Sequence, residues 1–273
     1  MLRTRGVNPD LVQVGDRVRL AGEAALRNET GIYARQMLLA DGREILLSIG
    51  ISPRWTDADT GELIVRELDE QTAAEARRNA EGVFRVWGTV LDDPAAFPMF
   101  KGGYPLTDAG RAALEQWDAT SAELTGCMKK AMPLIMITPY PIEFVRDGED
   151  IVMRMEEDDA VRRIHMGEAS PPDEHSFLGF STGSWDGDTL VVETTHMLAE
   201  LFSWEGVPQS EEIRVVERFM PSADGERMDY RITISDPVTF TEDFDLTRYF
   251  VWRPDLTVSP YDCVDSSVVR NPD

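Results

Sequence analysis

The stretch Ser181-Thr-Gly-Ser-Trp-Asp-Gly-Asp-Thr-Leu-Val-Val-Glu-Thr-Thr-His-Met197 predicts two β-strands joined by a tight turn. Asp186-Gly187 lies between β-prone flanks, and glycine accepts the positive φ that hairpin turns require. After the turn, side chains alternate between one face with Leu190, Val192, Thr194 and His196 and another with Val191, Glu193, Thr195 and Met197. The apolar face therefore ends in an imidazole, and the opposite face carries a carboxylate.

The chain around this hairpin is rich in strands. From Pro133 onward the pattern predicts eight strands, over 142–146, 151–155, 160–166, 177–184, 189–196, 212–220, 227–235 and 246–253. Eight strands joined mostly by short turns favour an antiparallel up-and-down barrel, lipocalin-like in type, that holds one small ligand. Gly183-x-Trp185 also resembles the Gly-x-Trp of calycins. A two-sheet sandwich stays open as the alternative, because periodicity does not separate it from a barrel.

Three domains are expected along this mainly β chain. Residues 1–66 predict a small N-terminal β unit, OB-like or SH3-like, from short alternating strands and the turns between them. Residues 67–130 predict a connector with a helix over 67–81, a strand over 83–91 and a helix over 108–124 that Thr107 caps. Residues 131–273 form the predicted barrel.

The charge of the chain excludes several partners. The net charge is −23, with 50 acidic and 27 basic residues, so this acidic protein repels phosphate backbones and anionic lipid heads. We therefore expect no nucleic-acid binding. No apolar run approaches the ~20 residues of a membrane span, so we expect no membrane insertion. Met1-Leu-Arg-Thr-Arg5 is not followed by an apolar region, so no signal peptide is expected within this sequence.

Several motifs occur in a fixed order. They are Cys127 with Met132-Pro133, Arg162-Arg-Ile164, Gly183-Ser-Trp-Asp-Gly-Asp-Thr-Leu-Val-Val-Glu-Thr-Thr195, Gly206-Val-Pro-Gln-Ser210 and Val215-Val-Glu-Arg-Phe219. This arrangement, over about residues 105–265, resembles a large, mostly uncharacterised family of exported bacterial β-proteins. The resemblance implies a periplasmic or exported protein, with the cytoplasm as the alternative, and it implies no agreed activity. Two positions depart from the family pattern, because Lys129 replaces a proline and Ser170-Pro171 replaces a His-Pro.

The two cysteines, Cys127 and Cys263, lie near the edges of the β-rich part. We expect a disulfide between them if the compartment is oxidising, and two unrelated thiols are the alternative. Neither lies in a CxxC or Cys/His cluster, and the three histidines show no H-x-H or H-E-x-x-H spacing. No metal and no cofactor are therefore expected.

Three residues are candidates for proton transfer: His196, Glu193 and Glu217. His196 shares a face with Leu190 and Val192, so it would border a cavity and titrate near neutrality, unless it is a hydrogen-bonded core histidine. Glu193 and Glu217 interrupt apolar strands. A buried carboxylate needs a cation, which Arg163, Arg231 or Arg248 would supply, and a structural Arg–Glu network is the alternative.

A second group of residues is expected to bind substrate. It contains Tyr104, Tyr140, Trp185, Arg163 and His165, for which aromatic core packing and strand pairing are the alternative roles. Loop-borne His175 is interpreted as a solvated histidine. Ser181 stands in a bare G-x-S-x-G string inside a predicted strand, without the strand-turn-helix context of a nucleophile, so we interpret that match as chance.

These residues favour a cofactor-independent acid–base enzyme of isomerase, cyclase or hydro-lyase type that acts on a small hydrophobic substrate in the barrel. The alternative is a non-catalytic carrier or sensor of such a ligand in the cell envelope. A third hypothesis is a structural exported domain that binds another protein through its N-terminal unit. The expected partner is a small hydrophobic molecule, and a homodimer stays open as the oligomeric state.

Overall fold

The structure is a computed structural model that describes residues 12–13, 15–24, 32–47, 52–57, 70–90, 93, 96, 103–117 and 128–261. The chain divides into two compact units, Met1–Glu67 and Leu68–Asp273. Cys127 and Cys263 lie outside the described residues, and so does the bridge expected between them.

The first unit is a three-stranded antiparallel sheet in the order β1-β2-β3, which confirms a small N-terminal β unit. Its strands are β1 (Arg19–Ala24), β2 (Ile32–Leu38) and β3 (Glu44–Leu46). The buried Glu44 carboxylate accepts hydrogen bonds from the backbone N–H groups of Arg54, Trp55 and Thr56, at 2.7 to 2.9 Å. One carboxylate thereby fixes the segment that follows the sheet.

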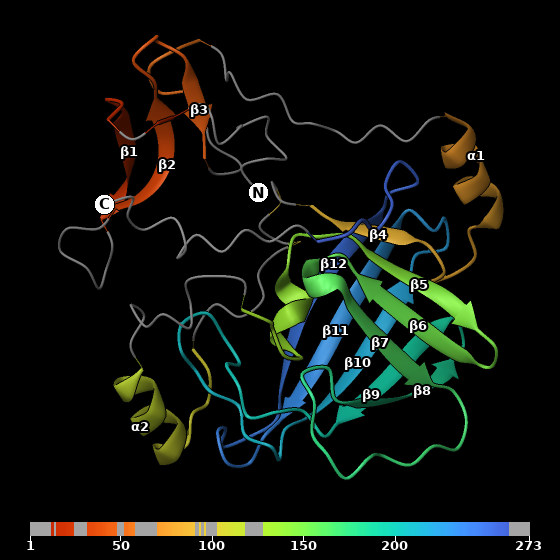
Figure 1. The fold of residues 1–273 in the computed structure, drawn as a ribbon. Helices are drawn as coiled ribbons and strands as arrows, with labels where there is room; N and C mark the ends of the chain where they lie inside the picture. The colour runs from red at the N-terminus through yellow and green to blue at the C-terminus, as the bar shows by residue number, and fades with distance from the viewer. Residues whose placement is uncertain are drawn as a thin grey trace. The chain divides into compact units, whose positions relative to one another are not determined.

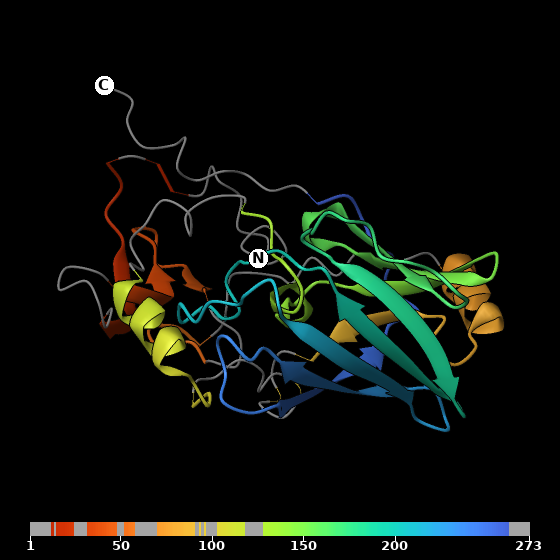
Figure 2. The same cartoon turned by 90° about the horizontal axis from the view of Figure 1, so that it is seen from below.

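The second unit is built on a closed barrel of nine strands, in the order β10-β11-β12-β4-β5-β6-β7-β8-β9 (Figures 1 and 2). Its strands are β4 (Val86–Thr89), β5 (Ile142–Asp147), β6 (Asp150–Met155), β7 (Ala160–His165), β8 (Phe180–Asp186), β9 (Thr189–Thr195), β10 (Arg214–Pro221), β11 (Arg227–Ser235) and β12 (Phe244–Trp252). The closed ring excludes the sandwich alternative.

The prediction of eight antiparallel strands is wrong in number and in direction. All eight predicted strands are present as β5 to β12, but β4, from the segment expected as a connector, enters the ring between β12 and β5. A closed ring with an odd number of strands cannot alternate up and down throughout, so at least one neighbouring pair must be parallel. That pair is β7 and β8, where Ile164 pairs with Ser181 and His165 with Thr182.

Side chains fill the barrel interior. In β9 the buried residues are Leu190, Val192 and Thr194, which confirms the alternation predicted for that strand. Across the interior, the rings of Phe144 and Phe219 meet edge to face with centroids 5.0 Å apart. The 3-10 helix Leu134–Ile137 (η4) buries all four of its residues in the same core.

Two helices accompany the barrel, α1 (Glu70–Asn79) and α2 (Asp108–Gln116), both shorter than predicted. Thr107 caps α2 as expected, because its hydroxyl accepts from the Gly110 N–H at 3.0 Å. Within the described part of the chain, neither helix has the length and apolar character needed to span a bilayer.

Candidate functional site

A belt of polar side chains crosses the inside of the barrel. Five consecutive strands, β7 to β11, each contribute one inward residue to it: Arg162, Ser181, Thr194, Glu217 and Tyr230. Arg162 donates to Ser181 Oγ at 2.8 Å, to Thr194 Oγ1 and to Glu217 Oε2. The two hydroxyls of Ser181 and Thr194 also bond each other at 3.0 Å. Arg162, Thr194 and Glu217, which come from three of the motifs noted in the sequence, therefore meet in one buried network, which we call the polar belt.

Tyr230 completes the belt by donating its hydroxyl to Glu217 Oε1 at 2.8 Å. Burial raises the pKa of Tyr230 well above its usual value, and the negative charge and hydrogen bond of Glu217 add to that rise. The neutral phenol is therefore the form that the folded barrel favours.

A second buried cation, Arg248, lies near the belt. Its guanidinium donates to the Met136 carbonyl and to Thr89 Oγ1, each at 2.6 Å, and it stacks on the Phe250 ring at 4.2 Å. Burial lowers the pKa of Arg248 to about 10, and Tyr230 opposes this fall. Arg248 thus joins η4, β4 and β12.

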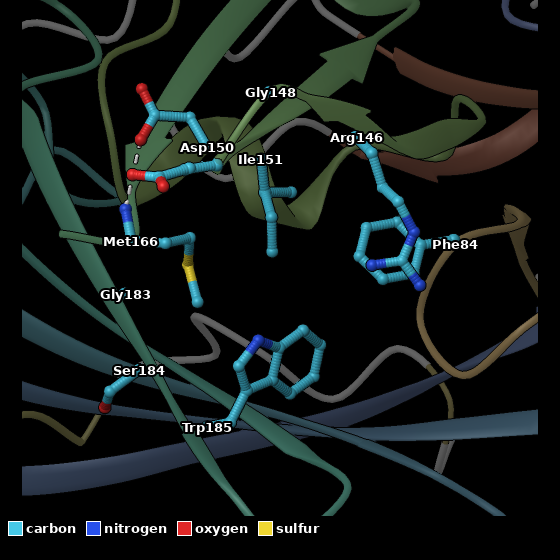
Figure 3. Close-up of a pocket in the computed structure, with 10 residues that line it drawn as sticks. Phe84, Arg146, Gly148, Asp150, Ile151, Met166, Gly183, Ser184 and Trp185 are labelled. Atoms are coloured by element: carbon cyan, nitrogen blue, oxygen red, sulfur yellow. Dashed lines mark hydrogen bonds between the residues drawn. The ribbon is translucent and has the colours of Figure 1, made fainter.

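An open cavity of about 310 Å³, here called the mouth pocket, lies at the barrel end that carries the β5–β6 and β8–β9 turns (Figure 3). Its lining residues are Phe84, Arg146, Gly148, Glu149, Asp150, Ile151, Met166, Gly183, Ser184 and Trp185. No residue of the polar belt lines it. The belt is buried inside the barrel, and the mouth pocket is one place among the described residues where a ligand has room.

Aromatic and cationic groups form one side of the mouth pocket. Trp185 lies on the same face of β8 as inward-facing Ser181 and Gly183, and its residue is 45% exposed. Its ring is 6.2 Å from that of Phe84, and the Arg146 guanidinium stacks on the Phe84 ring at 3.6 Å. In Figure 3 the indole points across the pocket toward Ile151 and Phe84.

The opposite side depends on a close fit between Gly183 and Met166. A Cβ atom on Gly183 would lie 2.6 Å from Ile164 Cγ2 and 2.6 Å from Met166 Sδ, so only glycine leaves room there. The Met166 N–H donates to Asp150 Oδ1 at 3.2 Å, as the dashed line in Figure 3 shows. This bond is the main reason why the pKa of Asp150 is lowered, and Arg163 and His165 add to it.

His196 does not border the mouth pocket. Its φ of 56° ends the alternation of β9, so Met197 takes the next buried position and His196 stays half-buried. Its ring stacks on that of His175 with centroids 5.2 Å apart, and its Nδ1 lies 2.9 Å from Thr195 Oγ1.

The two candidate glutamates lie on opposite faces of the barrel wall. Glu193 faces outward and pairs with Arg214 through two hydrogen bonds of 2.7 Å. Glu217 faces inward, and its cation partner is Arg162 instead of the expected Arg163, Arg231 or Arg248. Glu193 and Glu217 are therefore not brought together with His196.

Of the predicted binding residues, only Trp185 lines the mouth pocket. Arg163 and His165 lie behind its wall, where each reaches Asp150 Oδ2 at 3.2 Å. Tyr104 packs in an aromatic cluster with Phe202 at 5.2 Å, and Tyr140 meets the Tyr261 ring at 5.3 Å.

Sequence reasoning missed Phe84, Arg146 and Met166 as pocket residues. Arg146 could have been found, because it follows the buried residues Ile142 and Phe144 at the period of a strand. Met166 follows the buried Arg162 and Ile164 at the same period, whereas Phe84 precedes β4 and carries no such pattern. Among the described residues, no group of three or more His, Cys, Asp or Glu side chains is placed to hold a metal ion.

Comparisons with protein-family models, with curated proteins and with solved structures find no match to this chain.

Proposed function

We propose that the barrel binds a small, mainly apolar molecule in the mouth pocket. The observation that carries this proposal is the exposed Trp185 indole, which projects over a cavity of about 310 Å³ beside Phe84, Ile151 and Met166. This volume falls at the lower end of the range of ligand pockets. The pocket combines four apolar side chains with three charged ones, namely Phe84, Ile151, Met166 and Trp185 with Arg146, Glu149 and Asp150. An indole has a large apolar area, and its burial is favourable. A ligand that covers the Trp185 ring would gain this free energy on binding.

The test uses the neutral fluorescent probe N-phenyl-1-naphthylamine and a matched pair of tryptophan variants. Trp185 and Trp204 are 45% and 44% exposed, but Trp204 lies outside the mouth pocket, near Lys130. We expect Trp185→Ala to weaken probe binding at least tenfold and Trp204→Ala to change it less than twofold. Equal effects of the two variants would show that the probe binds elsewhere.

A carrier is the form of this function that the geometry favours, because a carrier needs only the pocket. One observation supports the acid–base enzyme as a second candidate: His165 Nδ1 lies 3.2 Å from the carboxylate of Asp150, a pocket residue. In that case Asp150, which lines the pocket, acts as the base in an isomerase- or lyase-type reaction, and His165 orients its carboxylate. The test is deuterium exchange from solvent into the α-carbon of a small alicyclic ketone. Exchange that His165→Gln removes, with probe affinity retained, would support the enzyme.

The motif resemblance leads us to propose further that the chain belongs to the exported bacterial β-proteins and works in the periplasm. Fractionation of cells that express the full-length gene tests this location. Recovery in the cytoplasmic fraction alone would contradict it.

A further inference from the structure

Strand β8 is longer than its pairing with β7. The two strands pair only at Ile164 with Ser181 and at His165 with Thr182, whereas β8 continues to Asp186 beside β9. The ladder with β7 ends at Thr182, and among the described residues no strand pairs with Ser184, Trp185 or Asp186 on the side away from β9. The end of β8 therefore has one open edge.

This open edge faces the mouth pocket. Gly183, Ser184 and Trp185 all line the pocket, although consecutive side chains of a strand point to opposite faces. A cavity lined by three consecutive residues of a strand extends along the strand's edge as well as along one face. Alternate N–H and C=O groups lie along that edge, next to the pocket.

The gap beside the edge has the width of one strand. Lower in the barrel β7 lies between β6 and β8, so these two strands are about 9–10 Å apart, twice the normal strand spacing. At Met166 the chain leaves the ladder, and its N–H goes to the Asp150 side chain instead. The pocket thus lies where β7 ends between β6 and β8, with the Met166 side chain in its wall.

We infer that the ligand of the mouth pocket is an extended peptide that pairs with the open edge of β8 and inserts one large apolar side chain beside Trp185. This inference rests on the proposed function, and it identifies the small apolar group that fills the pocket as one side chain of a peptide. Added strands gain affinity from main-chain hydrogen bonds and specificity from pockets for alternate side chains. The apolar walls formed by Phe84, Ile151 and Met166 suit a phenylalanine-sized group.

Charge complementarity specifies the peptide further. Glu149 is an exposed carboxylate in the pocket wall, while the guanidinium of Arg146 is already paired with Glu81 at 2.7 Å. The chain as a whole carries a charge of −23. A peptide with basic residues flanking its apolar one is therefore favoured over an acidic peptide.

The experiment compares three peptides on the full chain by their competition with N-phenyl-1-naphthylamine. The first is acetyl-Lys-Val-Phe-Val-Lys-amide. The second has the same side chains with N-methyl groups on its central amides, which removes hydrogen-bond donors and blocks strand pairing. The third replaces both lysines by glutamates. Direct titration calorimetry of each peptide accompanies the competition.

We expect the lysine peptide to displace the probe, the N-methylated peptide to bind at least tenfold more weakly, and the glutamate peptide at least threefold more weakly at low salt. Equal affinity of the parent and N-methylated peptides, with the probe still bound through Trp185, would overturn strand pairing and leave the proposed function standing. Binding of the probe without binding of any peptide would also overturn strand pairing and leave the proposed function standing. Failure of the probe and of all peptides to bind would overturn both proposals.

Discussion

The Arg162 guanidinium and the Glu217 carboxylate form an ion pair inside the barrel, with side-chain exposures of 1% and 0%. Arg162 comes from β7 and Glu217 from β10, and β8 and β9 separate these strands in the ring. Ser181 and Thr194, on the two strands between, accept further hydrogen bonds from Arg162. Removing two charges from water is unfavourable, and only the complete set of partners compensates for it.

Single and double replacements of this pair should differ in the size of their effect on stability. We expect Arg162→Met or Glu217→Leu alone to lower the free energy of unfolding by about 3–5 kcal/mol, because each leaves a buried charge without its partner. The double variant should lie within about 2 kcal/mol of the wild type, since it removes both desolvated charges. Urea unfolding of the four proteins measures this. A double variant as unstable as the sum of the singles would contradict the interpretation.

Tyr230 should make the barrel sensitive to alkali. Its pKa in the folded protein is raised by burial and by Glu217, above the value of about 10 for an unfolded chain. The stability that its neutral form contributes is thus complete below pH ~10 and is lost as the pH rises above that value. Tyr230→Phe should lower the free energy of unfolding by about 1–3 kcal/mol at pH 7, because the Glu217 carboxylate loses a hydrogen-bond donor.

The Tyr230→Phe variant should show a smaller fall in the urea unfolding midpoint between pH 10 and 11 than the wild type. Tyr261→Phe should also weaken this decline, because partial burial raises the pKa of Tyr261 to about 12 at a residue outside the belt. An unchanged alkaline decline in Tyr230→Phe would assign the effect to other groups.

His196 should tolerate glycine better than alanine. Its φ of 56° is in the left-handed region, where glycine has no steric penalty and other residues do. We expect His196→Ala to lower the free energy of unfolding by about 1 kcal/mol and His196→Gly to leave it nearly unchanged. Neither change should alter probe binding in the mouth pocket. A loss of binding or turnover in both variants, with stability retained, would restore His196 as a site residue.

Local patterns predicted the strands better than the site. Alternation along residues 189–195 was sufficient to orient β9, but β4 is only four residues long and enters the ring through pairing with strands distant in sequence. The place of β4 in the ring, and hence the need for one parallel pair, depends on its pairing with β12 and β5. For Glu217 the sequence offered Arg162 and Arg163 side by side, and the buried Ile164 selects Arg162 as the inward one. The positive φ of His196 has no signal in the residue type.

Gly183 should control the size of the mouth pocket. A Cβ there would lie 2.6 Å from Ile164 Cγ2 and Met166 Sδ, and the flexible Met166 side chain has the freedom to move into the cavity. We expect Gly183→Ala to lower the free energy of unfolding by about 1–3 kcal/mol through overpacking. It should also weaken binding of N-phenyl-1-naphthylamine at least fivefold, because Met166 then occupies ligand space.

Gly187 provides the control in the same hairpin, because a Cβ there would meet no atom within 4 Å although its φ is 62°. Gly187→Ala should therefore reduce stability through backbone strain alone and leave probe affinity unchanged. Adding Met166→Ala to Gly183→Ala should recover most of the affinity, since it removes the displaced side chain. If Gly183→Ala keeps full stability and probe affinity, the contact between Gly183 and Met166 does not define the pocket wall. The ligand space must then be defined by Trp185 and the β5–β6 turn.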